Sequence, residues 1–565
     1  MNSETKQCKG CKKDFTIEPD DFSFYEKMEV PAPTLCSKCR RVRRLSWRND
    51  WGLYSRDCSL CSKKFISIYA PHTPFKLLCP KCFHGDGWNP FDYGMDYDPN
   101  RSFIEQCIEL QKKTPTLGVI NDNDIASTNC LYTNDVAFSK NCAMVFIAWK
   151  LENVFNSVSL AAGKDLSDCL GVAEESQYSY DGVMINGVSN CKSIYWCTSC
   201  VSCSFCYDCR GCQDCFMSSG LRNKKYYFKN QQYSKDEYEK IIASYELHTR
   251  TGYKKAKDEF VEFLKDKPRQ FAELRNCTAC LGTDMIRSKN VKNARFASFS
   301  EDSNYVFDGV NFKSCYDCTV GGETELSYEC ITPDNSYHSI STLESWKNTH
   351  VAYCFDCHSS QNLLGCVGVK KGEYCILNKK YSKEEYLALY EKIVADMKAR
   401  GEWGEFFPTK YSPFGINETQ AQRELNLSKE DAVAAGYAWQ DNMQETRGRE
   451  TIGQQDVANS INDISDSFSS EILACTTCQR NYKILPEELT LYRRLLVPIP
   501  TECFFCRHAA RERMRGDYDL IKRQCDCNSE NHGHENQCVN EFQTFFTKRE
   551  PRPIYCEVCY QKELL

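Results

Sequence analysis

The middle of this chain places small apolar residues at every third position, a period that belongs neither to a helix nor to a simple strand. Gly, Asn, Asp and Ser are common between these positions and favour turns. We therefore predict a narrow β-solenoid with short sides and an interior of small buried side chains. The register is clearest where cysteine fills it without interruption, at Cys197, Cys200, Cys203, Cys206, Cys209, Cys212 and Cys215.

This segment occurs twice, at an offset near 148 residues. The two copies extend over about residues 129–241 and 276–389. The clearest matches are Tyr233–Tyr238 with Tyr381–Tyr386 and Cys206–Cys209 with Cys354–Cys357.

Helices are predicted to close both copies, because Ser234 and Ser382 are each followed by acidic residues, as at a capped helix start. After the first copy the helix is predicted to continue over 236–264. A short helix is predicted from Ser428 to near Gly436.

The composition is that of a globular protein with several folded units, with 38 cysteines, 41% hydrophobic and 26% charged residues among 565. No run approaches the roughly 18 apolar residues of a membrane helix, and the first residues lack the apolar core of a signal peptide. We therefore expect a cytoplasmic protein with reduced cysteines. In that setting Cys-x-x-Cys pairs indicate metal ligands, and the cysteines of the middle region indicate buried thiols, with metal binding or disulfides there as alternatives.

Three modules are complete. Each consists of two Cys-x-x-Cys motifs that are separated by a loop of hairpin size. Four thiolates at this spacing match the tetrahedral coordination of a closed structural zinc site. The predicted ligands are Cys8, Cys11, Cys36 and Cys39; Cys58, Cys61, Cys79 and Cys82; and Cys475, Cys478, Cys503 and Cys506.

A fourth module has a clear second half, Cys556 and Cys559, and a degenerate first half. Cys538 precedes the aromatic Phe542 as the first-half cysteines of the other modules precede theirs. The remaining ligand is predicted to be Cys525 or Cys527, with His532 and His534 as substitutes.

The predicted class is mixed and β-rich: two duplicated cysteine-rich β-solenoid units with capping helices, flanked by tandem zinc ribbons at both ends. The predicted domains are two tandem ribbons in 1–90, a connector in 91–128, a first solenoid unit with its helix in 129–265, a second with helix and tail in 266–440, a polar linker in 441–470 and two tandem ribbons in 471–565.

Basic residues follow the second half of the first module. Residues 1–90 hold 16 Lys and Arg against 10 Asp and Glu, in a chain of formal net charge −6. Arginine binds phosphate in a bidentate manner and tryptophan stacks on bases, so this segment is a predicted nucleic-acid-binding site. The alternative is a helix whose arginines pair with the acidic middle of the chain. The residues are Arg40, Arg41, Arg43, Arg44, Trp47 and Arg48.

Two resemblances accompany these motifs. The first and third modules share aromatic residues (Phe15 or Tyr482, Phe24-Tyr25 or Leu491-Tyr492), a proline (Pro31 or Pro498) and an arginine after the last cysteine, and so resemble the family of probable zinc-ribbon domains. The rest of the chain resembles uncharacterised cysteine-rich proteins predicted in candidate-phylum bacteria. This resemblance implies zinc binding and no particular activity. Its residues are Gly401–Pro408, Ser412–Gly415, Asn417–Thr419, Tyr437 and Trp439.

The sequence contains no P-loop, Rossmann fingerprint, Gly-x-Ser-x-Gly elbow or His-Glu-x-x-His motif. We therefore predict a non-catalytic protein that binds three to four zinc ions and contacts RNA, DNA or the ribosome through its basic segments. The alternative is a protein–protein interaction scaffold built on the solenoid, and an enzyme is a third class. The identity of the partner and the oligomeric state do not follow from the residues.

Overall fold

The computed structural model describes residues 2–122, 125–164, 169, 171, 181–183 and 192–564. The chain forms two compact units, each assembled from two separate stretches, Met1–Ile120 with Glu273–Met443 and Asn121–Ala272 with Gln444–Leu565. The first unit contains the N-terminal cysteine modules and the second copy of the repeat; the second unit contains the first copy and the C-terminal modules. The predicted domains follow one another along the chain, whereas the stretches of these two units alternate along the sequence.

The modules of the first unit are built from short hairpins and helices. The elements of this part are β1 (Glu4–Gln7), β2 (Asp14–Ile17), α1 (Pro19–Lys27), α2 (Ser37–Leu45), β3 (Tyr54–Asp57), β4 (Lys64–Ser67), β5 (Leu77–Leu78), α3 (Pro80–His84), η1 (Pro90–Tyr93), α4 (Phe103–Lys113) and β6 (Thr116–Leu117).

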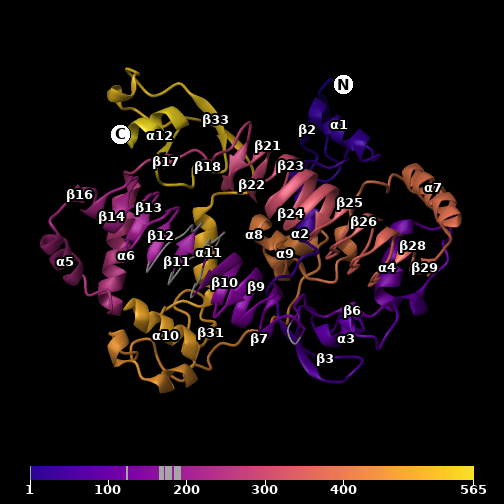
Figure 1. The fold of residues 1–565 in the computed structure, drawn as a ribbon, viewed down its shortest axis with the longest axis horizontal. Helices are drawn as coiled ribbons and strands as arrows, with labels where there is room; N and C mark the ends of the chain where they lie inside the picture. The colour runs from indigo at the N-terminus through magenta and orange to yellow at the C-terminus, as the bar shows by residue number, and fades with distance from the viewer. Residues whose placement is uncertain are drawn as a thin grey trace. The chain divides into compact units, whose positions relative to one another are not determined.

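The second copy of the repeat forms a parallel sheet in the first unit, visible as side-by-side arrows in Figure 1. Its strands pair with residues twelve positions along the chain, as Val351 does with Leu363 and Leu363 with Cys375. The elements are β18 (Leu274–Arg275), β19 (Gly282–Thr283), β20 (Met285–Ile286), β21 (Lys289–Lys292), β22 (Ala294–Ser298), β23 (Glu301–Asn304), β24 (Phe307–Ile331), β25 (Tyr337–Ile340), β26 (Thr349–Ala352), β27 (Gln361–Leu364), β28 (Glu373–Ile376), β29 (Lys379–Lys380), α7 (Lys383–Arg400), η2 (Thr409–Tyr411), η3 (Ile416–Glu418), α8 (Ala421–Leu425) and α9 (Lys429–Ala434).

The second unit contains the corresponding parallel strands of the first copy, also in a register of twelve, as Ser204 with Phe216. The elements are β7 (Thr128–Leu131), β8 (Asn134–Ala137), β9 (Lys140–Glu152), β10 (Phe155–Lys164), β11 (Asp181–Val183), β12 (Ser193–Tyr195), β13 (Ser204–Tyr207), β14 (Gln213–Ser219), β15 (Lys225–Phe228), β16 (Gln231–Gln232), α5 (Lys235–Ala243), α6 (Arg250–Lys265), β17 (Arg269–Gln270), η4 (Ile461–Asp463), η5 (Asp466–Ser470), β30 (Leu473–Ala474), β31 (Asn481–Tyr482), α10 (Pro486–Leu495), α11 (Phe504–Met514), β32 (Ile521–Gln524), η6 (Glu530–His532), β33 (Glu541–Thr544), β34 (Ile554–Tyr555) and α12 (Glu557–Glu563).

We call these two sets of parallel strands the first ladder (β7–β15, in the second unit) and the second ladder (β19–β28, in the first unit). The β-rich class predicted from the sequence is confirmed, and the strands pair as open sheets. Among the described residues, no helix is both long and apolar enough to span a membrane.

The backbone of the ladders turns at every third residue. The φ angles lie between 51° and 55° at His350, Tyr353, Asp356, Ser359 and Asn362. This is the left-handed region of the backbone, which residues other than glycine rarely adopt. The regular spacing of these turns is the structural basis of the period of three in the sequence.

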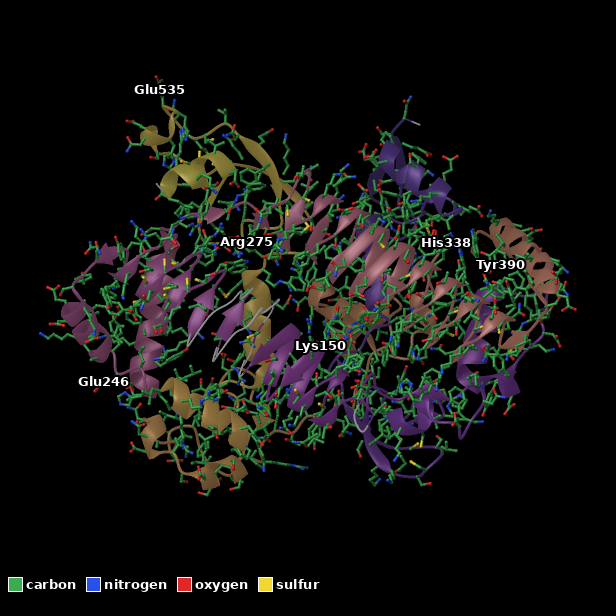
Figure 2. The ribbon with its side chains drawn as sticks, viewed as in Figure 1. Lys150, Glu246, Arg275, His338, Tyr390 and Glu535 are labelled. Carbon is green, nitrogen blue, oxygen red and sulfur yellow. The ribbon has the colours of Figure 1, made fainter. Side chains whose placement is uncertain are left out.

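The positions that directly follow these left-handed residues face inward, and most hold small apolar side chains. In the second ladder they include Val351, Cys354, Cys357, Leu363 and Cys366, which are buried in one cluster. Figure 2 shows the corresponding sulfur atoms of the first ladder along β13 and β14. Thiols here also donate to backbone carbonyls, as Cys200 Sγ does to Cys209 O at 3.3 Å.

The capped helices are confirmed. Ser382 and Glu385 form a capping box at the start of α7, and Ser234 and Glu237 do the same for α5. The short helix after Ser428 is also present as α9.

The single helix predicted over 236–264 is wrong. Two helices occupy this stretch, α5 and α6, because Glu246 has a left-handed φ of 49° and Thr249 caps a new helix.

The segment 441–470, predicted to be a linker, is packed. Val457, Ile461, Ile464 and Phe468 are buried against residues of α10 in one hydrophobic cluster. These four residues follow one another at intervals of four, three and four positions, a helix-like spacing that the polar composition of the segment obscured.

The ladder thiols should resist modification while the chain is folded. Cys354 and Cys366 are fully buried, and burial raises the pKa of both thiols well above the ordinary value. Only the thiolate reacts, so labelling with a thiol reagent at pH 8 should reach these residues only after denaturation. Mass spectrometry of labelled peptides measures this, and labelling of Cys354 at the rate of a denatured control would contradict it.

Candidate metal centres

The four cysteine modules share one local design. An antiparallel hairpin carries the first two cysteines between its strands, and the third cysteine is the N-cap of the following helix. A helix N-terminus favours negative charge, so this position suits a thiolate. In the first module, hydrogen bonding with Cys39 lowers the pKa of the Cys36 thiol to about 5, whereas burial raises the pKa of the equivalent Cys79 and Cys503 thiols. The N-cap cysteines are Cys36 (α2), Cys79 (α3), Cys503 (α11) and Cys556 (α12).

The same backbone contact orients the sulfurs in every module: the amide of the third cysteine donates to the sulfur of the first. The N···Sγ distances are 3.2 Å for Cys36–Cys8, 3.4 Å for Cys79–Cys58, 3.2 Å for Cys503–Cys475 and 3.2 Å for Cys556–Cys525. This shared contact makes the four modules equivalent at the level of individual atoms.

The sulfurs lie at distances that a tetrahedral metal ion requires. Second and third sulfurs are 3.8 Å apart for Cys11–Cys36, 4.0 Å for Cys61–Cys79, 3.7 Å for Cys478–Cys503 and 4.0 Å for Cys538–Cys556. Four thiolates around zinc at 2.3 Å would stand about 3.8 Å apart.

Within each module the four candidate ligand atoms lie within 4.8 Å of one another. All predicted metal residues except Cys527 belong to these four groups, which can hold metal ions. The groups are Cys8, Cys11, Cys36, Cys39; Cys58, Cys61, Cys79, Cys82; Cys475, Cys478, Cys503, Cys506; and Cys525, Cys538, Cys556, Cys559.

The structure identifies the remaining ligand of the fourth module as Cys525. Its amide donates to Asn540 O at 2.9 Å, as that of Cys8 does to Lys13 O at 2.9 Å in the first module. Cys527, His532 and His534 lie beside this group and form a further cluster with Cys559. Among the residues that the structure describes, no cysteine of the ladders belongs to a cluster of this kind.

The basic residues predicted to bind nucleic acid are buried. They lie on α2 and the turn that follows it, and Arg40, Arg41, Arg43, Arg44, Trp47 and Arg48 are each at most 9% exposed. They therefore form no surface for phosphate or bases, and the predicted position of a nucleic-acid interface is wrong.

The guanidinium groups of α2 instead bind carboxylates of the second ladder. Arg44 Nη1 lies 2.8 Å from Glu329 and 3.0 Å from Asp317, and Arg40 Nε lies 2.9 Å from Asp317. Burial alone would lower the pKa of Arg40, but the charge of Asp317 raises it well above the ordinary value. We call Arg40, Arg44, Asp317 and Glu329 the buried ion-pair cluster.

Further arginines of this segment bind carboxylates from the tail of the repeat. Arg43 pairs with Glu405 at 2.5 Å, and Arg41 makes a bidentate contact with Glu424 at 2.6 and 2.9 Å. The Trp47 indole donates to Phe407 O at 3.2 Å and lies among aromatic rings of the core. The alternative interpretation, in which the arginines meet the acidic middle of the chain, matches these contacts.

The second unit repeats the arrangement. Arg511 of α11 lies 3.1 Å from Asp181, and both side chains are largely buried. Phe504 at the start of α11 packs on Phe146 of the first ladder, with ring centroids 5.7 Å apart.

Sequence reasoning did not identify the carboxylates that receive these arginines. Asp317 and Glu329 are fully buried side chains, yet each stands among many acidic residues of the middle region. The sequence offered one signal for the importance of Asp317: it belongs to an Asp-Cys pair that occurs in both copies of the repeat, with Asp168 at the equivalent position of the first copy. Asp168 lies outside the described residues.

Comparison with protein-family models finds none that matches the chain, and no curated protein matches it.

The buried ion-pair cluster should contribute strongly to stability. Arg44→Ala removes the cation that lies between Glu329 and Asp317 and leaves these two buried carboxylates with only Arg43 and Arg40 beside them. The substitution should lower the free energy of unfolding by about 3–5 kcal/mol, the cost of breaking a buried pair. Lys38→Ala on the same helix is the control: Lys38 is half exposed, 3.9 Å from Glu424, and should cost less than about 1 kcal/mol. Urea unfolding of the metal-loaded chain compares the two, and equal losses would contradict the role of the cluster.

Proposed function

We propose that this chain is a zinc-binding, non-catalytic scaffold for protein–protein interaction. The observation that carries the proposal is the burial of the arginines of α2 against carboxylates of the second ladder. The cysteine modules thereby attach to the repeat within their own unit, and the basic surface that nucleic acid would need is used internally.

Zinc is the metal that the donor sets favour. Four cysteine thiolates at tetrahedral spacing are typical of structural zinc sites, and they leave no coordination position for a substrate or water. The resemblance to zinc-ribbon domains agrees with this donor set.

Each ladder is best interpreted as a β-solenoid with a turn of twelve residues and four sides of three residues. The register of twelve, the left-handed residue at every third position and the inward-facing thiols all support this interpretation. A solenoid presents long, regular sides and two ends, which are surfaces that binding proteins use.

The start of the first ladder is the position where we expect the protein partner. β7 ends its sheet, and the nearby side chains of Leu131, Tyr132 and Phe138 are 52%, 52% and 59% exposed. An edge strand with exposed apolar side chains suits the addition of an extended segment from another protein.

Zinc content tests the first part of the proposal. The purified chain should hold at least about four zinc ions, and Cys36→Ser should remove about one and release α2 from the second ladder, because folding of such a module depends on its metal. Elemental analysis against protein concentration measures this, and fewer than about two ions per chain would contradict it.

Native complexes test the second part. In native lysate the chain should migrate within a protein complex that withstands nuclease treatment. The double substitution Leu131→Ser and Phe138→Ser should dissociate that complex, because the edge at β7 loses its exposed apolar side chains. Val261→Ser, at a position of similar exposure (55%) on α6, is the matched control. A complex that nuclease dissolves, or that the double variant retains, would favour nucleic acid or another surface.

A further inference from the structure

The fourth module differs from the others by an insertion within its hairpin. Its first two ligands are Cys525 and Cys538, whereas the first two ligands of the first module are Cys8 and Cys11. The inserted residues lie between β32 and β33 and carry Cys527, His532 and His534. The insertion therefore adds three side chains that ligate metals to a module that already has four thiols.

These three side chains converge with a thiol of the original group. One ligand atom each from Cys527, His532, His534 and Cys559 lies within 4.8 Å of the others. Cys527 Sγ is 3.1 Å from His532 Nδ1, and Cys559 Sγ is 3.5 Å from His534 Nε2. Sulfur and nitrogen ligands of one tetrahedral zinc ion stand about 3.5 Å apart.

His534 has an oxygen partner of the kind found around metal-bound histidines. Its Nδ1 lies 2.6 Å from Asn536 O, a hydrogen bond that fixes the tautomer and leaves Nε2 available to bind a metal. His532 Nε2 lies 3.7 Å from the Glu563 carboxylate, longer than a hydrogen bond, and its Nδ1 is the atom near Cys527.

The insertion is held in this conformation by its surroundings. Cys527 and Cys559 are at most 1% exposed and His532 is 9% exposed. Gly533 takes a left-handed φ of 86° between the two histidines, and Lys562 Nζ donates to His532 O at 2.5 Å. The loop projects at Glu535, which lies at its outer tip in Figure 2.

We propose that the fourth module is a dinuclear zinc centre, in which Cys559 bridges one ion held by Cys525, Cys538 and Cys556 and a second held by Cys527, His532 and His534. This inference rests on the proposed zinc binding of the four modules and adds a fifth ion. Two divalent ions with five thiolates and two neutral imidazoles carry a net charge of about −1, against about −2 for one ion with four thiolates, so the second ion reduces the buried negative charge.

Metal stoichiometry of the full chain tests the centre. The parent should hold about five zinc ions, and His534→Ala or Cys527→Ser should each remove about one, because each is a ligand of the second ion only. Cys559→Ser should remove about two, because it belongs to both ions. Cys506→Ser is the matched control, since Cys506 is the corresponding fourth ligand of the third module, and it should remove about one.

Cobalt replacement gives a second readout that does not depend on tolerance of these substitutions. Loading the last equivalent of Co²⁺ into the parent should diminish the high-spin electron paramagnetic resonance signal, because a bridging thiolate couples two neighbouring ions magnetically. His534→Ala should abolish that decrease.

Four ions in the parent, with no loss in His534→Ala and no decrease of the Co²⁺ signal, would overturn the dinuclear centre while leaving the proposed function intact. Fewer than about two ions in the parent would instead contradict the proposed function itself.

Discussion

The packing of each unit depends on charged side chains that are buried and paired with side chains of opposite charge. In the first unit, Arg40 and Arg44 extend from a helix whose N-cap is a cysteine of the metal group, and they meet Asp317 and Glu329 inside the protein. Burying such charges is costly unless the geometry is correct. The cysteine group fixes where α2 begins, and α2 in turn fixes where the guanidinium groups lie, so the clustering of the four thiols and the ion pairing form one connected constraint.

The duplication of the chain extends to this constraint. Glu329 and Asp181 differ by the same 148 positions that separate the two copies of the repeat (329 − 181). Each pairs with an arginine from a helix that begins at the third cysteine of a candidate metal group. The equivalent positions Asp208 and Asp356 nevertheless differ in their surroundings. Asp208 lies 2.7 Å from Arg222 and accepts a hydrogen bond from the Tyr560 hydroxyl. Asp356 lies near Lys370, and burial raises the pKa of its carboxyl to about 7. The two units therefore keep one design with different surrounding charges.

Local chemistry could be predicted from the sequence, and long-range pairing could not. Spacing alone grouped the cysteines, since ligands of one ion lie near one another along the chain, and the period of three indicated regular turns and inward thiols. The burial of Arg44 depends on Glu329, 285 positions away, and a run of arginines has the same appearance whether its partner is phosphate or carboxylate. Cys527 was ambiguous for a different reason, since two groups of candidate metal ligands share one short segment.

The interleaving of the units has a consequence for synthesis on the ribosome. The first ladder emerges before residues 444–565, which complete its unit, so Asp181 exists for much of translation without Arg511. A polypeptide interrupted at residue 443 contains all of one unit and an incomplete second one. Vectorial synthesis thus completes the unit that holds the N-terminus first, and the unit begun at Asn121 is the last to acquire its full set of contacts.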